Sequence, residues 1–167
     1  MKKVHGSWFP SPAPRAGSAD GLMAVIERCR DRRVLDIGDL HPRLHERIAE
    51  VALDVVAMDV DYEGIERLRA AGYNAFCGSI SQRAWSASDT SFDVVVADGV
   101  IEHLTVPSAL LDFARDRLQP GGVLVLTTSA RIGAGSRALA DRSGLILRTA
   151  VPMAAGHTAV YVLQKVA

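Results

Sequence analysis

Short, almost wholly apolar runs alternate with helical patterns along this chain, and no other feature restricts its fold as strongly. Five such runs occupy residues 34–37, 55–58, 74–77, 92–97 and 123–128. Strands that lack polar alternation are covered on both faces, and helices of about ten residues between them imply parallel pairing through right-handed crossovers. The sequence therefore predicts a doubly wound α/β fold with a mostly parallel, Rossmann-like sheet and helices on both faces.

Helical spacing of apolar residues fills the segments between these strands. It predicts helices over residues 20–29, after Pro42, over 63–71, around 81–85, over 107–118 and over about 135–142. Two further strands, 145–151 and 158–164, are joined by a turn that is too short for a crossover helix. We therefore expect a seven-stranded sheet whose last strand is antiparallel.

The beginning of the chain has a different composition. Three prolines and two glycines within residues 1–19 disfavour helix and strand, so we expect an N-terminal arm there and a single domain over residues 20–167. Aromatic residues in such an arm often dock on the parent domain. A lid over a ligand cleft is therefore one hypothesis for Trp8 and Phe9.

Charge and cysteine content argue against several classes of partner. Lys plus Arg and Asp plus Glu both total 19, so no overall field draws the chain to nucleic acid or an anionic membrane. No stretch has the ~20 apolar residues of a membrane helix. Cys29 and Cys77 lack the spacing of metal or redox pairs and are expected to be buried free thiols. These features predict a cytoplasmic protein without a nucleic-acid or membrane partner.

Acidic residues gather where the predicted strands end, the edge at which open α/β sheets bind ligands. They are Asp36, Asp39, Asp59, Asp61 and Asp98. Asp59 lies 21 residues beyond Gly38, close to the spacing at which a carboxylate binds the ribose of a ligand held over the first turn. This spacing predicts a ribose-bearing ligand.

The turn after the first strand, Gly38-Asp39-Leu40-His41-Pro42, is unsuited to a pyrophosphate. It has one glycine, a negative side chain and a proline without an amide proton. A ligand with an ammonium, a sulfonium and a ribose fits this acidic edge better than a dinucleotide does. A dehydrogenase is accordingly disfavoured.

Four segments, in order, resemble the class I S-adenosylmethionine-dependent methyltransferases, particularly the small bacterial type with a D-x-G-x-G-x-G turn. They are residues 34–38, 56–59, 92–104 and 118–122. Each motif is weak by itself, whereas the ordered set is specific. With the terminal strand pair, the resemblance covers about residues 20–167.

The resemblance implies S-adenosylmethionine as cofactor and assigns site residues by position. Asp36 and Gly38 would shape the turn under the methionine part, followed by Asp39 as a further cofactor-binding candidate. The other implied cofactor-binding residues are Asp59 for the ribose, Val60, Ser79 and Ile80 for the adenine, and Ala97, Asp98 and Gly99 for the methionine end. His103 is the candidate catalytic base. Turn or capping roles are the simpler alternative for Asp98 and His103.

The chain also departs from the family pattern. Leu40 and Pro42 replace the later glycines of the turn, and Ser79 stands where an Asp often binds the adenine. Two hypotheses therefore remain open. One is an enzyme that methylates an oxygen, nitrogen or carbon of a small-molecule acceptor. The other is a catalytically silent methyltransferase-like domain that binds a protein partner or forms a homodimer.

A metal site is a weaker alternative at the same edge. His41 and His45 are four residues apart on one predicted helix face, and Glu102 and His103 follow a neighbouring strand. Small-RNA terminal methyltransferases use an E-x-x-E-H metal motif, but Gly99 occupies its first glutamate position here. Solvated or capping histidines are the simpler interpretation, so we expect no metal.

Overall fold

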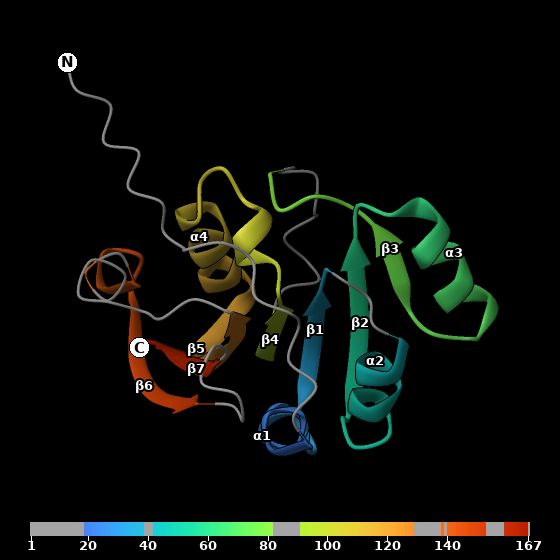
Figure 1. Ribbon diagram of the computed structural model, residues 1–167, viewed down its shortest axis with the longest axis horizontal. Helices are drawn as coiled ribbons and strands as arrows, with labels where there is room; N and C mark the ends of the chain where they lie inside the picture. Colours follow the sequence, from blue (N-terminus) through green and yellow to red (C-terminus); the bar gives the residue numbers. More distant parts are fainter. Residues whose placement is uncertain are drawn as a thin grey trace.

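The computed structural model describes residues 19–38, 42–81, 91–128, 138, 140–152 and 159–166. Its strands are β1 (Arg33–Ile37), β2 (Asp54–Asp59), β3 (Ala75–Cys77), β4 (Phe92–Asp98), β5 (Leu118–Thr128), β6 (Leu145–Pro152) and β7 (Ala159–Lys165). They form one seven-stranded sheet in the order β3-β2-β1-β4-β5-β7-β6 (Figure 1). The predicted doubly wound α/β class is confirmed.

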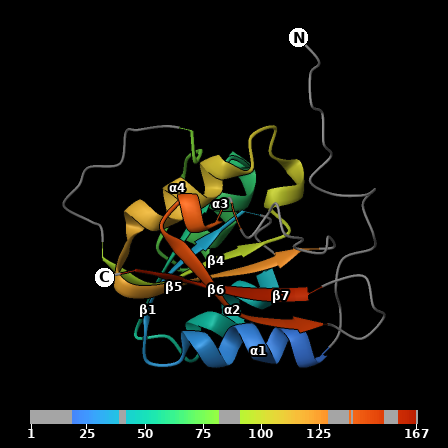
Figure 2. The same cartoon turned by 90° about the vertical axis from the view of Figure 1, so that its left-hand side faces the viewer.

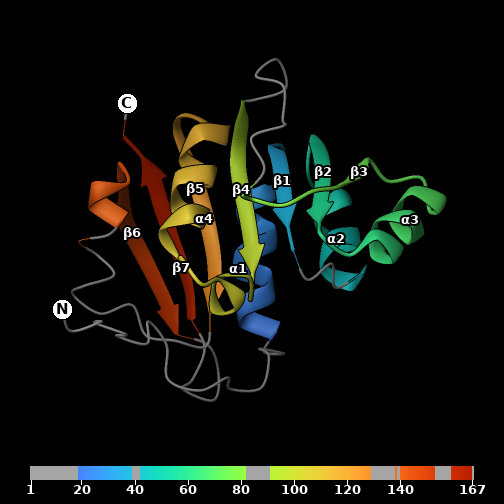
Figure 3. The ribbon, with the colours of Figure 1, turned by 90° about the horizontal axis from the view of Figure 1, so that it is seen from above.

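Pairing within the sheet follows the expected mixture of directions. β1 pairs in parallel with both β2 and β4, and β2–β3 and β4–β5 are also parallel. β7 runs antiparallel to β5 and to β6, between which it lies (Figure 3). The prediction of an antiparallel last strand is therefore confirmed.

Helices cover both faces of this sheet. They are α1 (Ala19–Cys29), α2 (Pro42–Ala49), α3 (Tyr62–Ala70) and α4 (Ser108–Arg117), with a 3-10 turn, η2 (Ile101–His103). α1 lies on one side of the sheet and α4 on the other (Figure 2). Alternate strand residues consequently enter different cores: Val34 packs with residues of α1 and α2, whereas Leu35 packs with residues of α4.

The amphipathic helices bury the faces that their spacing predicts. Val25, Ile26 and Cys29 of α1 are almost inaccessible to solvent. The predicted inner face of the 107–118 segment is also buried, at Leu110, Phe113 and Ala114 of α4 and at Leu118, the first residue of β5. Apolar residues three and four positions apart thus face the sheet, as an amphipathic helix requires.

The region around Pro120 differs from its prediction. α4 ends at Arg117, one residue before its predicted end, and β5 begins at once at Leu118, so the predicted strand start at residue 123 is wrong. The β4–β5 register shifts between Phe92 and Val94, so these residues form an irregular part of the ladder. A Cβ on Gly122 would lie only 3.0 Å from the Asp93 carbonyl oxygen, which explains a glycine at this point of close approach.

Several expectations fall outside the described segments. These are the arm with Trp8 and Phe9, most of the helix around residues 81–85, part of the helix over 135–142, whose described residues 138 and 140–142 are helical, and most of the final turn. Within the segments that are described, no helix combines the length and the hydropathy needed to span a bilayer.

The two cysteines occupy different environments. Cys29 is fully buried in the α1 core, and this burial raises the pKa of its thiol to about 12. Cys77 is exposed at the end of β3, with its sulfur 3.6 Å from the Val60 carbonyl oxygen. The expectation of buried thiols is therefore right for Cys29 and wrong for Cys77, because β3 is a short edge strand whose last residue faces solvent.

We expect thiol-specific reagents to separate these two residues. At pH 8 a disulfide reagent should modify Cys77 quickly in the folded chain and leave Cys29 unmodified until urea unfolds the protein, because Cys29 is buried and protonated. Cys77→Ser should abolish the fast phase. Since the folded pKa of Cys29 is raised, its contribution to stability is complete below pH 9.0 and is lost as the pH rises from there towards about 12. Fast modification in Cys77→Ser would contradict this placement.

Candidate functional site

A cavity of about 540 Å³ lies at the edge of the sheet where β1, β2, β3 and β4 end. The arrowheads of β1 and β2 point to this edge in Figure 1. Seven residues predicted from the sequence line it: Gly38, Asp59, Val60, Ser79, Ile80, Gly99 and His103. The cavity is also lined by Ile37, Met58, Asp61, Gly64, Arg67, Gly78, Val100 and Leu104.

The backbone at Gly38 determines the shape of one wall. Its N–H donates to the Met58 carbonyl oxygen at 2.8 Å, which continues the β1–β2 ladder by one residue. Gly38 has a φ of +68°, and a Cβ there would lie 2.6 Å from Cγ2 of Val100. Only glycine meets both requirements, so the chain can turn out of β1 directly against Val100.

Asp59 ends β2 with its carboxylate at the cavity. Its Oδ1 accepts a hydrogen bond from the Asp61 N–H at 2.8 Å, and Asp61 in turn caps α3 by accepting from the Glu63 N–H. In the part of the chain that the structure describes, no residue donates to Oδ2 of Asp59. The helix cap thus holds one carboxylate oxygen in place, and the other is available to a hydroxyl-bearing ligand.

Apolar and small residues form the neighbouring wall. Val60 is 70% exposed and lines the cavity together with Ile80. Gly78 is tied to β2 by a 2.8 Å hydrogen bond from its N–H to the Asp59 carbonyl oxygen, and this bond brings Ser79 and Ile80 to the cavity. A flat aromatic base would contact Val60 and Ile80 here without needing a charged partner.

Asp36 lies in the core and does not line the cavity. Its side chain is hydrogen-bonded to Nδ1 of His45 in α2 at 2.9 Å, and both residues are buried. The His45 ring also meets Tyr73 edge-on, with 4.9 Å between centroids. Burial raises the pKa of Asp36, while the hydrogen bond and charge of His45 act to lower it and the charge of Asp59 adds to the rise. Asp36 therefore links β1 to α2 within the core.

The pairing of His45 with Asp36 also bears on the hypothesis of a metal site. A histidine bonded to Asp36 in the core does not extend to the sheet edge with Glu102 and His103. His41 lies outside the described residues. Among those that are described, no three His, Cys, Asp or Glu side chains are grouped so that they could hold a metal ion.

The other predicted methionine-end residues are placed differently from one another. Ala97 is buried in the α4 core, and the Asp98 carboxylate accepts a hydrogen bond from the Thr127 hydroxyl of β5. Neither residue lines the cavity, whereas Gly99 does. Asp39 is outside the described residues.

His103 faces the cavity from η2. The backbone N–H of His103 donates to the Val100 carbonyl oxygen at 3.1 Å, and this bond closes the turn. The imidazole has no hydrogen-bond partner within the described segments, so its nitrogens can serve a ligand. A catalytic role for His103 remains a prediction.

Sequence reasoning missed the contribution of α3. Asp61 and Arg67 line the cavity beside Asp59, and Nη2 of Arg67 lies 3.6 Å from Oδ2 of Asp61. Asp61 was among the acidic residues expected at this edge, whereas Arg67 is typical of a solvated helix face and was not expected to line the cavity. The available signal was the short distance along the chain from Asp59 to the first turn of the following helix.

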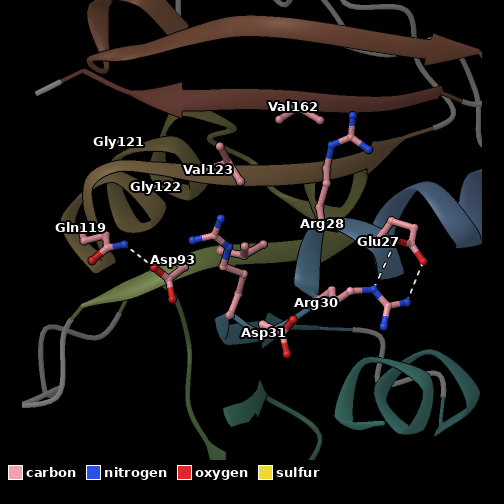
Figure 4. A pocket seen from close by; sticks show the side chains of 12 residues that line it. Glu27, Arg28, Arg30, Asp31, Asp93, Gln119, Gly121, Gly122, Val123 and Val162 are labelled. Atoms are coloured by element: carbon pink, nitrogen blue, oxygen red, sulfur yellow. Dashed lines mark hydrogen bonds and ion pairs between the residues drawn. The ribbon is translucent and has the colours of Figure 1, made fainter. Parts of the chain in front are cut away.

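A second cavity, of about 460 Å³, lies at the opposite edge of the sheet (Figure 4). Several of its charged groups already have partners: Arg30 pairs with Glu27 at 2.9 Å, and Asp93 accepts from the Arg33 N–H and the Gln119 side chain. It lies away from the carboxyl ends of the parallel strands, where ligands of open α/β sheets bind. The cavity at Asp59 is therefore the candidate functional site.

We expect the buried Asp36–His45 pair to be a large local contribution to stability. His45→Leu should lower the free energy of unfolding by about 2–4 kcal/mol, because it leaves the Asp36 carboxyl buried without its partner. Urea denaturation followed by circular dichroism measures this. Glu27→Gln, which breaks an exposed ion pair with Arg30, is the control and should have no detectable effect. Equal effects of the two substitutions would refute the assignment.

Comparison with known proteins agrees with this geometry. A family model described as a methyltransferase domain matches residues 15–164. The ubiquinone biosynthesis O-methyltransferase of Roseobacter denitrificans is 32% identical over 120 residues, which cover 70% of this chain and 48% of that protein. The chain thus spans about half the length of the curated relatives it matches.

Solved structures share the fold at lower identity. A TehB-like SAM-dependent methyltransferase from Corynebacterium glutamicum has a TM-score of 0.70 and 22% identity, covering 86% of this chain and 85% of that one. SAM-bound CalS10, an amino pentose methyltransferase from Micromonospora echinaspora, has a TM-score of 0.70 and 16% identity, with 87% and 90% covered. This chain belongs to the methyltransferase domain family, and its fold is that of the S-adenosylmethionine-dependent methyltransferases.

Proposed function

We propose that this chain binds S-adenosylmethionine in the cavity at Asp59 and transfers its methyl group to a small-molecule acceptor. The observation that carries the proposal is the Asp59 carboxylate, held at the end of β2 beside the glycine turn that leaves β1. A carboxylate in this place is suited to accept two hydroxyl hydrogen bonds from a ribose.

The cavity fits the chemical groups of this cofactor. Its volume of about 540 Å³ is within the usual range for small-molecule sites. Val60 and Ile80 offer apolar contact to the adenine. Gly38 and Gly99 have φ values of +68° and +64°, and their lack of side chains lets the backbone approach the methionine part.

The residues of the chain orient the reactants. When bound, the cofactor supplies a methyl group activated by its sulfonium. Asp59 holds the ribose, and the backbone at Gly38 and Gly99 limits where the methionine part lies, so that an acceptor can be aligned with the methyl group. His103 is available to take the proton of an acceptor hydroxyl or amine that reacts in its protonated form.

An oxygen acceptor is favoured over nitrogen or carbon. The sequence relative from Roseobacter denitrificans is an O-methyltransferase, which supports this choice, although the aligned region is only 48% of that protein. The cavity wall at Val100, His103 and Leu104 combines apolar surface with one imidazole. We propose that this wall faces an apolar small molecule with an ionisable hydroxyl.

Cofactor affinity tests the proposal. We expect calorimetry to detect S-adenosylmethionine and S-adenosylhomocysteine binding in the micromolar range, and Asp59→Ala to weaken both by about 30- to 100-fold through lost ribose hydrogen bonds. Asp54→Ala is the matched control, because Asp54 is an exposed residue at the opposite end of the same strand. Its affinities should equal those of the parent.

The alternative of a silent domain that binds a protein partner or a second copy predicts the opposite result. If neither ligand binds at millimolar concentration and Asp59→Ala does not differ from the parent, the enzyme proposal fails. Binding without methyl transfer to any phenolic, amine or carbon acceptor would instead leave the cofactor site intact and refute the reaction.

A substitution in the turn provides an independent test. We expect Gly38→Ala to reduce S-adenosylhomocysteine affinity at least about tenfold, because the new Cβ would displace Val100 from the cavity wall. Gly72→Ala is the control: its φ is +90°, no atom lies within 4 Å of a Cβ there, and it does not line the cavity. Both variants should lose about 1–2 kcal/mol of stability from backbone strain. Equal ligand affinity of the two would contradict the prediction.

A further inference from the structure

A buried hydroxyl on β5 connects that strand to the cavity wall. Thr127 is 5% exposed and lies opposite Asp98 in the β4–β5 ladder. Its hydroxyl donates to Oδ1 of Asp98 and accepts from the Gly99 N–H at 3.2 Å. One hydroxyl thus donates its proton to Asp98 and accepts a hydrogen bond from Gly99, the residue that follows β4.

These bonds fix the direction in which the chain leaves β4. The Gly99 N–H also reaches the Thr127 carbonyl oxygen at 3.2 Å, so the Asp98–Gly99 peptide is held by two oxygens of one residue. Gly99 then turns with a φ of +64° and lines the cavity. A change in the orientation of this peptide would therefore displace Gly99 and, with it, the cavity wall.

The next residue transmits the position of Gly99 across the site. Val100 follows Gly99 and packs against Gly38, where a Cβ would come within 2.6 Å of its Cγ2. Closely packed groups tolerate little displacement. A contiguous path therefore leads from Thr127 through Gly99 and Val100 to the turn after β1, on both sides of the proposed methionine position.

We propose that Thr127 is a positioning residue for cofactor binding, which orients Asp98 and Gly99 at the methionine end of the cavity. Thr127 does not line the cavity and acts through its two neighbours on β4. The inference rests on the proposed function, since it assigns Thr127 a part in holding the same cofactor. Its chemical requirement is a hydroxyl, not a particular volume.

The chain offers a matched control one residue further on. Thr128 is 1% exposed and also belongs to β5, but successive residues of a strand point to opposite faces. Thr128→Val therefore removes a buried hydroxyl from the same strand without touching the contacts to Asp98 and Gly99. A general loss of strand stability would appear in both variants.

The experiment compares Thr127→Val, Thr127→Ser and Thr128→Val with the parent chain. S-adenosylhomocysteine affinity is measured by calorimetry and stability by urea denaturation. We expect Thr127→Val to weaken the ligand about tenfold, because it leaves the shape nearly unchanged and removes both hydroxyl contacts. Thr127→Ser should restore affinity to within about twofold, and Thr128→Val should bind as the parent does. If Thr127→Val fails to fold, Thr127→Cys replaces it.

The outcomes separate this inference from the proposed function. Parental affinity in Thr127→Val, weakening in Thr128→Val as large as in Thr127→Val, or failure of serine to rescue would overturn the positioning role while leaving the cofactor site in place. Absence of ligand binding by the parent chain would overturn both. Faster amide hydrogen exchange at Gly99 in Thr127→Val, but not in Thr128→Val, is expected as direct support.

Discussion

The turn after β1 comes so close to Val100 that no side chain fits between them, and the candidate site depends on this contact. The Gly38 N–H extends the ladder to β2, and the same residue turns away with positive φ against a residue that follows β4. Gly38 thereby connects the ends of β1, β2 and β4. Gly38 and Gly99, which have no side chains, expose the main chain to this part of the cavity.

Two carboxylates that the family resemblance associates with the ligand are engaged inside the protein. Asp36 is held by His45 of α2, and Asp98 by Thr127 of β5. Asp36 is buried and Asp98 is half-buried, and a carboxylate removed from water without a partner would be unfavourable, so each is bonded to a residue of an adjacent element. Asp59 differs because its nearest partner is the backbone of the same loop, and it stays at the cavity. Resemblance to a family thus predicts the position of a residue along the chain more reliably than it predicts where the side chain of that residue points.

The sequence was sufficient for the sheet and for much of the cavity lining. Apolar runs such as 92–97 report burial on both faces, and parallel strands necessarily bring Gly38, Asp59 and Gly99 to one edge. What could not be predicted involves contacts between distant residues. Neither the His45 partner nor the role of Thr127 leaves a local pattern, since a buried threonine in a strand looks like any other β-prone residue. The irregular start of β5 was missed because proline and glycine end helices and also form bulges.

The position of β7 imposes an order on assembly of the sheet. β6 comes earlier in the chain than β7, yet it joins the sheet only through β7, which lies between β5 and β6. Until residues 159–165 have been synthesised and inserted, β5 is therefore an unpaired edge with an apolar stretch at Val123–Leu126. Such an edge is a template for association with other chains. A nascent polypeptide of this topology consequently passes through an interval of aggregation risk that ends only when its last strand closes the ladder.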